Sequence, residues 1–171
     1  MKVHDTAIEG LLRIELDVHE DERGWFKESW QRAKLTALGV PDLGVVQHNV
    51  SYNAKRGVTR GIHAEPWDKL ISPAFGSVFA AIVDLRLSAP TVETFKLGVA
   101  DALYVPRGLG NSFCALEDNT AYSYLVNAHW SPDAVYANVN LFDPSLAIAW
   151  PVPREEMTIS AKDLALPNLS P

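Results

Sequence analysis

The stretch NSFCALEDNTAYSYLV, residues 111–126, shows a pattern that recurs along the whole chain. It contains two runs rich in aromatic or β-branched residues, and the polar segment EDN separates them. Runs of this kind, bounded by Gly, Pro, Asp or Asn, are typical of strands in an antiparallel β-sandwich or barrel. The sequence therefore predicts an all-β protein of the jelly-roll type, whose two sheets enclose a cavity. The other runs are GVVQHNVSY (44–52), GVTRGIH (57–63), KLISPAF (69–75), SVFAAIVDLRL (77–87), TFKLGV (94–99), ALYVP (102–106), YANVNLF (136–142) and AIAW (147–150).

Helical periodicity is scarce, so we expect few and short helices. The best candidate is ESWQRAKLTALG (28–39), which Gly39 and Pro41 close. A second short helix should begin at SAKD (160–163), with Ser160 as its cap and Asp163 in its first turn. The chain contains no repeat and no linker, and its 171 residues, 47% of them hydrophobic, suffice for one core. We predict a single domain over residues 1–171.

The charge balance excludes several classes of partner. The chain has 15 Lys plus Arg against 21 Asp plus Glu, and this net charge of -6 argues against a nucleic-acid or membrane-surface binder. The first residues lack the apolar run of a signal segment, and no window is apolar enough to span a membrane. The lone Cys114 lies in an apolar run and builds no disulfide framework. These features predict a cytoplasmic protein.

The segment GVTRGIHAEPWDK (57–69) combines strand residues with three side chains that carry or can gain a positive charge. A core strand does not need Arg60, His63 and Lys69 unless something anionic or acidic binds beside them. Strict alternation along the strand would place Arg60 and His63 on opposite faces. A β-bulge at Gly61 would turn one of them toward the other. This segment is therefore the first candidate for a functional site.

Seven blocks of the sequence occur in an order that is specific as a set. They are DERGWFKES (21–29), QHNVSYNAKRGVTRGIHAEPWDKL (47–70), VDLRLSAPT (83–91), VPRGLGNSF (105–113), YSYLVNAHWSP (122–132), DPSLAIAWP (143–151) and SAKD (160–163). Together they resemble the dTDP-4-dehydrorhamnose 3,5-epimerase family, and most closely the epimerase half of fused epimerase–reductase proteins of some actinobacteria. The resemblance implies a double-stranded β-helix of the cupin type and a homodimer whose partners exchange N-terminal strands. It also implies a reaction without a cofactor or a metal.

The same resemblance implies a reaction on a nucleotide sugar: epimerisation at carbons 3 and 5 of dTDP-4-keto-6-deoxy-D-glucose, which gives dTDP-4-keto-L-rhamnose. This chemistry needs a base, an electropositive group at the enolate oxygen, and a proton donor on the opposite face. By resemblance, His63 is the base and Asp163 orients it. Lys69 stabilises the enolate oxygen, and Tyr124 returns the proton. An NADPH-dependent reductase, as a separate protein or a transient partner, would then use the product.

The nucleotide end of such a substrate needs cations for the diphosphate, and an aromatic surface and amides for the base. By resemblance, Trp130 stacks on thymine, and Arg23 and Glu28 enter the pocket of the other subunit. The remaining positions that match substrate-binding residues of the family are Gln47, Asn49, Arg60, Asn111 and Lys162.

Two positions depart from the family pattern. Asn111-Ser112-Phe113 stands where the family usually has His-Gly-Phe, so an amide replaces an imidazole that contacts the substrate. Val135 stands where many members have a glutamate that contacts the ligand. The first departure leaves open an epimerase that acts at carbon 3 alone or at carbon 5 alone. The second leaves open whether dTDP or UDP is preferred.

Two other classes of protein share the cupin architecture. A metal-dependent cupin gathers two or three His with a carboxylate, but here His63 and Glu65 are too few, because Asn111 occupies the later position. A non-catalytic cupin that binds sugar nucleotides would keep Arg60 and Trp130 and lose one of the four catalytic residues. All four are present, and this favours an enzyme.

Overall fold

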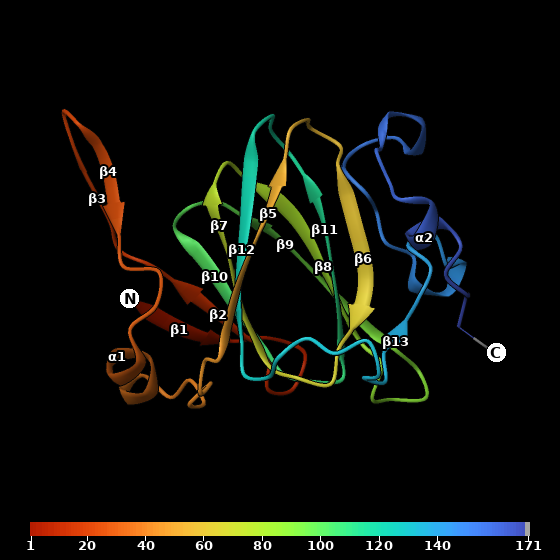
Figure 1. Cartoon of the computed structure of the whole chain (residues 1–171), viewed down its shortest axis with the longest axis horizontal. Coiled ribbons are helices and arrows are strands. Elements are labelled where there is room, and N and C mark those ends of the chain that lie inside the picture. The colour runs from red at the N-terminus through yellow and green to blue at the C-terminus, as the bar shows by residue number, and fades with distance from the viewer. Residues whose placement is uncertain (170–171) are drawn as a thin grey trace.

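The computed structural model describes residues 1–169 and consists mainly of two antiparallel sheets packed face to face (Figure 1). No helix within this range is long and apolar enough to cross a membrane. The two packed sheets confirm the predicted all-β, cupin-like jelly roll. The six-stranded sheet has the order β1 (Lys2–Asp5), β2 (Leu12–Glu15), β10 (Asp101–Val105), β7 (Lys69–Phe75), β12 (Thr120–Val126) and β5 (Gln47–Asn53). The five-stranded sheet has the order β13 (Ala137–Asn138), β6 (Thr59–Ala64), β11 (Leu109–Ala115), β8 (Val78–Asp84) and β9 (Thr91–Leu97).

The main core lies between the two sheets. Alternate side chains of each strand point inward, so that Ile71 and Leu103 of one sheet meet Ile82 of the other in one apolar cluster. Phe113 of β11 stacks on Tyr122 of β12, with ring centroids 4.1 Å apart and an interplanar angle of 24°. This stacked pair joins the two sheets and forms part of the wall of a polar cavity.

The helix predicted over residues 28–39 is shorter than expected. Helix α1 spans Arg32–Ala37, because Gln31 is extended and its side chain caps the helix by accepting from Lys34 N (2.6 Å). The residues before Gln31 instead lead out of a hairpin. Gly39 has a φ of 93° and ends the helix where the sequence predicts. Leu35 of α1 is buried in a second apolar cluster, together with residues of β2 and β10.

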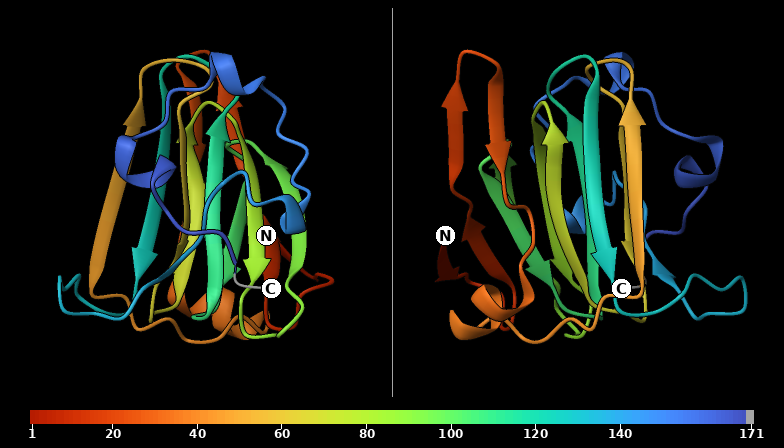
Figure 2. Two further views of the ribbon diagram at one scale, coloured as in Figure 1. Left: turned by 90° about the vertical axis from the view of Figure 1, so that its right-hand side faces the viewer. Right: turned by 60° about the vertical axis from the view of Figure 1, so that its left-hand side comes forward.

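Strands β3 (Val18–Asp21) and β4 (Gly24–Lys27) form a hairpin that projects from one edge of the sandwich (Figures 1 and 2). At its base, Lys27 Nζ donates to Ser72 Oγ (3.0 Å), Pro73 O (2.7 Å) and Val99 O (2.8 Å). Burial among these neutral acceptors lowers the pKa of Lys27 to about 8. One cationic side chain thus ties the exposed hairpin to the six-stranded sheet.

The C-terminal segment passes through two 3₁₀ turns, η1 (Pro144–Leu146) and η2 (Arg154–Glu156), and reaches helix α2 (Ala161–Leu164). Ser160 caps α2 as predicted, since its Oγ accepts from Asp163 N (3.0 Å). Asn140 Nδ2 donates to Leu166 O (3.0 Å) and holds the chain just after the helix. Figure 1 shows α2 beside β6, which brings Asp163 to the strand that carries His63.

Candidate active site

Strand β6 contains the bulge that the sequence allows. Asn111 of β11 pairs with His63, and Phe113 pairs with Arg60, so β6 has one more residue than β11 between the two pairs. Gly61 lies in this bulge with a φ of 107°, and a Cβ there would come within 2.6 Å of the Asn111 carbonyl oxygen. As a result, Arg60 and His63 both line one cavity between the sheets.

This cavity has a volume of about 170 Å³ and is lined mainly by polar side chains. It brings together three of the residues that the sequence predicts as catalytic, His63, Lys69 and Tyr124, although they come from different strands. The fourth, Asp163, lies behind His63. The full lining consists of Ser51, Arg60, His63, Glu65, Lys69, Asn111, Phe113, Tyr122 and Tyr124.

His63 and Asp163 form a hydrogen-bonded pair. The distance from His63 Nε2 to Asp163 Oδ1 is 2.8 Å, and the carboxylate is buried whereas the imidazole is partly exposed. A buried carboxylate fixes which ring nitrogen carries the proton, so that the other nitrogen is an acceptor. The pair therefore has the arrangement of a carboxylate-oriented general base.

Lys69 is the buried cation of the cavity. Its side chain is 4% exposed, and its Nζ lies 2.6 Å from Glu65 Oε2. Burial lowers the pKa of Lys69, and the neighbouring carboxylate opposes part of that effect. The sequence pattern makes Glu65 a candidate metal ligand and does not indicate it as the partner of Lys69. Glu65 and Lys69 are four residues apart, and this spacing was the only sequence signal for their contact. Such a spacing predicts a contact within a helix but not across a turn between two strands.

Two tyrosines of β12 reach the cavity. Burial raises the pKa of Tyr124, and the Glu65 carboxylate adds to this effect, so that the phenol stays protonated and can donate. Tyr122 is completely buried, and its hydroxyl donates to Asn111 Oδ1 (3.3 Å). The hydroxyl of Tyr122 is therefore bonded to the protein, whereas Tyr124 has no such partner among the residues described.

Of the residues predicted to bind the nucleotide, Arg60 lines the cavity, whereas Gln47, Asn49 and Trp130 lie outside its lining. On β5, Gln47 Nε2 donates to Asn49 Oδ1 (2.9 Å), and Gln47 Oε1 accepts from Trp130 N (3.1 Å). The Trp130 side chain itself is exposed. Arg60 Nε donates to Asn53 Oδ1 (3.2 Å).

Three predicted binding residues lie away from the cavity. Arg23, on the projecting hairpin, pairs with Asp21, and Glu28 pairs with Lys34 at 2.8 Å. Lys162 is exposed on α2, one residue before Asp163. A single chain therefore assembles the residues predicted for proton transfer but leaves part of the predicted nucleotide site outside.

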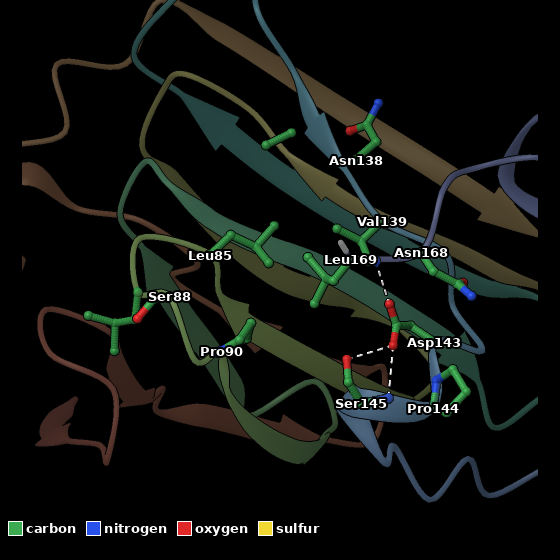
Figure 3. A pocket seen from close by; sticks show the side chains of 12 residues that line it. Leu85, Ser88, Pro90, Asn138, Val139, Asp143, Pro144, Ser145, Asn168 and Leu169 are labelled. Carbon is green, nitrogen blue, oxygen red and sulfur yellow. Dashed lines mark hydrogen bonds between the residues drawn. The ribbon is translucent and has the colours of Figure 1, made fainter. Parts of the chain in front are cut away.

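A larger cavity, of about 700 Å³, lies between the β8–β9 connection and the C-terminal segment (Figure 3). Leu85, Pro90 and Val139 contribute to its walls, and none of its lining residues is predicted for function from the sequence. Its acidic residue, Asp143, already accepts from the backbone and hydroxyl of Ser145 and from Leu169 N (Figure 3). The smaller, polar cavity is therefore the candidate active site.

A protein-family model described as dTDP-4-dehydrorhamnose 3,5-epimerase matches residues 5–171. The chain belongs to this family. A relative named RmlC homolog, from Streptococcus pyogenes, is 43% identical over 152 residues, which cover 84% of this chain and 77% of the relative. The dTDP-4-dehydrorhamnose 3,5-epimerase of Mycobacterium tuberculosis is 32% identical, and the alignment covers 98% of this chain and 87% of the relative.

The fold of the family is also that of this chain. The structure of RmlC from Streptococcus suis, in complex with dTDP-D-xylose, has a TM-score of 0.91 to this epimerase-family chain and 41% sequence identity. The alignment covers 98% of this chain and 90% of the other. The resemblance inferred from the seven sequence blocks is thereby confirmed.

Proposed function

We propose that this chain catalyses the reaction of its family without a cofactor. It inverts carbons 3 and 5 of dTDP-4-keto-6-deoxy-D-glucose and forms dTDP-4-keto-L-rhamnose. The observation that carries the proposal is the His63–Asp163 hydrogen bond, because His63 shares one small cavity with the buried Lys69 and with Tyr124. Each of the three groups that the chemistry requires is thus available within one chain.

The first step is removal of a proton beside the ketone. The free nitrogen of His63 takes the proton, and the electron pair of the C–H bond moves into the bond between that carbon and carbon 4. The ketone oxygen then becomes an enolate oxygen, and the Lys69 ammonium stabilises its charge. A buried cation is effective here because few water molecules screen it.

The second step returns a proton from the other face. His63 belongs to β6 and Tyr124 to β12, so they come from the two different sheets that enclose the cavity. Protonation of the enolate carbon by Tyr124 restores the ketone and inverts the centre. Before the second carbon reacts, His63 releases its proton to solvent and the phenolate of Tyr124 takes one from solvent, so that both groups regain their starting states.

The functional unit that we propose is a homodimer with exchanged N-terminal strands. Arg23 and Glu28 carry family positions of the nucleotide site, yet neither lines the cavity of their own chain. They lie on or beside the hairpin of β3 and β4, which projects from the edge of the sandwich (Figure 1). Val50, Tyr52 and Phe75 are exposed on β5 and β7. Both strands flank β12 in the six-stranded sheet, and apolar side chains exposed on one sheet support a contact with a second copy.

A reductase follows from the chemistry of the product. The product keeps its ketone at carbon 4, so a further enzyme must reduce it to reach the deoxysugar. We propose that this enzyme is an NADPH-dependent reductase in the cytoplasm, either separate or transiently associated.

The test is solvent exchange in deuterated water, followed by NMR at carbons 3 and 5 of the substrate. The wild type should incorporate deuterium at both carbons, and His63→Ala should abolish this. His4→Ala is the matched control, because His4 is paired with Glu15 on the edge strand β1 and should exchange normally. Exchange at one carbon only would indicate a mono-epimerase. No exchange in the wild type would favour a cupin that binds sugar nucleotides without catalysis.

A further inference from the structure

Glu65 is an acidic side chain of the cavity to which the proposed reaction assigns no role. It follows β6 and precedes β7, and its side chain is 19% exposed. Its Oε2 lies 2.6 Å from Lys69 Nζ and also accepts from Trp67 Nε1 (3.1 Å). One carboxylate oxygen thus holds the buried lysine on one side and a buried indole on the other.

The indole fixes the carboxylate in turn. Trp67 is buried and meets Tyr136 edge to face, with ring centroids 5.8 Å apart. The Tyr136 hydroxyl donates to Ser131 O (2.8 Å). Glu65 is therefore held between a buried ring and a buried cation, and its carboxylate has little freedom to leave Lys69.

The surroundings of Lys69 explain why it needs this partner. Arg60 and His63 of β6 face the same cavity, as do Asn111 of β11 and Tyr124 of β12. Tyr122 of β12 and Ser51 of β5 complete the polar lining. Among these groups Glu65 is the carboxylate, and Arg60 is a second fixed cation. Without Glu65, a desolvated ammonium would face another positive charge and no negative one.

We propose that Glu65 is a positioning residue that keeps the ammonium of Lys69 charged and directed at the enolate oxygen of the substrate. This inference rests on the proposed epimerase function. Of the three donors of the ammonium, one is occupied by Glu65, and two remain for the ketone oxygen and its surroundings. Glu65 itself does not exchange a proton with the substrate.

Removal of the Glu65 carboxylate should change how the reaction rate depends on pH. Loss of the carboxylate leaves burial as the dominant influence on Lys69 and lowers its pKa further. The lysine then loses its charge at a lower pH. The fall in rate on the high-pH side of the profile therefore shifts to lower pH. The substitution leaves the hydrogen bond between His63 and Asp163 in place, so the low-pH limb should move much less.

The experiment compares wild type, Glu65→Gln, Glu65→Asp and Glu156→Gln. Deuterium incorporation is measured across the pH range from about 6 to about 10, which spans the ionisation of imidazole and amine groups. Thermal unfolding confirms that each variant is folded. Glu156→Gln is the charge-matched control, since it also removes one negative charge but from an exposed pair with Arg56 at 3.4 Å.

In Glu65→Gln the high-pH limb should move down by about 1 to 3 pH units, as expected for removal of an adjacent opposite charge. Glu65→Asp keeps the charge at a shorter reach and should move the limb less in the same direction. The control should superimpose on the wild type. A folded Glu65→Gln with an unmoved limb would overturn the inference, as would an unmoved limb in Glu65→Asp if the Gln variant does not fold. An inactive wild type would instead overturn the proposed function.

Discussion

The cavity and the hairpin carry two halves of one predicted site, and their functional side chains are held in different ways. In the cavity, His63 bonds to Asp163 across 100 residues of sequence, and Lys69 bonds to Glu65 in a buried pair. On the hairpin, Arg23 pairs with an acid two residues away and stays exposed. Proton transfer needs positions that are fixed within fractions of an ångström. Nucleotide binding by an exposed arm needs a second surface to which the arm attaches.

The largest expected effect is in the cavity. Asp163→Asn replaces the carboxylate by an amide that no longer fixes the imidazole tautomer, so the rate of deuterium incorporation should fall about 100- to 10,000-fold. Asp118→Asn, which alters an exposed pair with Lys55, is the control and should not change the rate. An unchanged rate in Asp163→Asn would reduce Asp163 to a structural residue at the start of α2.

A second variant separates the two walls of the cavity. Tyr124→Phe removes the proposed donor but leaves the base, so His63 can still remove a proton and return a deuteron to the same face. Exchange should therefore persist while inversion falls by roughly 100-fold, the size of one general acid. NMR distinguishes exchange from inversion. Tyr122→Phe, which removes the bond to Asn111, should reduce inversion less. The reverse order would assign the donor role to Tyr122.

A substitution on the hairpin should have a smaller effect on activity, but it can show which subunit's site the hairpin serves. Arg23→Ala should raise KM about tenfold or more, because charge-assisted hydrogen bonds to a diphosphate are lost. The decisive measurement mixes Arg23→Ala with His63→Ala chains under conditions of subunit exchange. If each hairpin serves its partner, the heterodimer contains one intact site, and about a quarter of wild-type activity should return.

If the hairpin instead serves its own cavity, every site in the mixture carries one defect. Activity would then stay at the level of the two separate variants. This outcome would contradict the proposed exchange of N-terminal strands while leaving the chemistry of the cavity intact.

The smallest effect concerns the base of the hairpin. The pKa of Lys27 is lowered from 10.5 to about 8 by burial, so between these values the folded protein binds fewer protons than the unfolded chain. Stability then rises with pH across this window, and the contribution is lost as pH falls through about 8. Lys27→Met should remove this dependence. Urea unfolding of both proteins at about pH 7.5 and about pH 10 measures how the free energy of unfolding changes with pH. If this free energy changes equally in wild type and in Lys27→Met, Lys27 is not the source of the pH dependence.

Much of the fold could be predicted from local signals. Most of the aromatic and β-branched runs became strands, Ser160 capped α2, and Gly61 allowed a bulge in β6. The run AIAW (147–150) was wrongly predicted as a strand, and only Ala137–Asn138 of the run at 136–142 forms one. The helix at 28–39 was predicted too long, because its periodicity continues into residues that lead out of the hairpin. Local patterns indicate which elements form better than they indicate where each element begins.

The candidate site could be predicted less directly. The contact between His63 and Asp163 joins distant parts of the sequence, and family resemblance predicted it where local patterning did not. Glu65 was missed as a partner of Lys69, because residues four apart meet reliably on helices and not across a strand and a turn. The proposed position of Arg23 in the site of a second subunit would likewise be a property of an assembly, which one chain does not encode in its local pattern.

The position of α2 late in the sequence has a consequence for biosynthesis. Every group that lines the cavity belongs to residues 51–124, whereas the carboxylate that orients the imidazole is residue 163. A growing chain can therefore pair its strands and enclose the cavity before the base is oriented. Since synthesis proceeds from the N-terminus, the nascent protein acquires its complete catalytic pair only when the last short helix has left the ribosome.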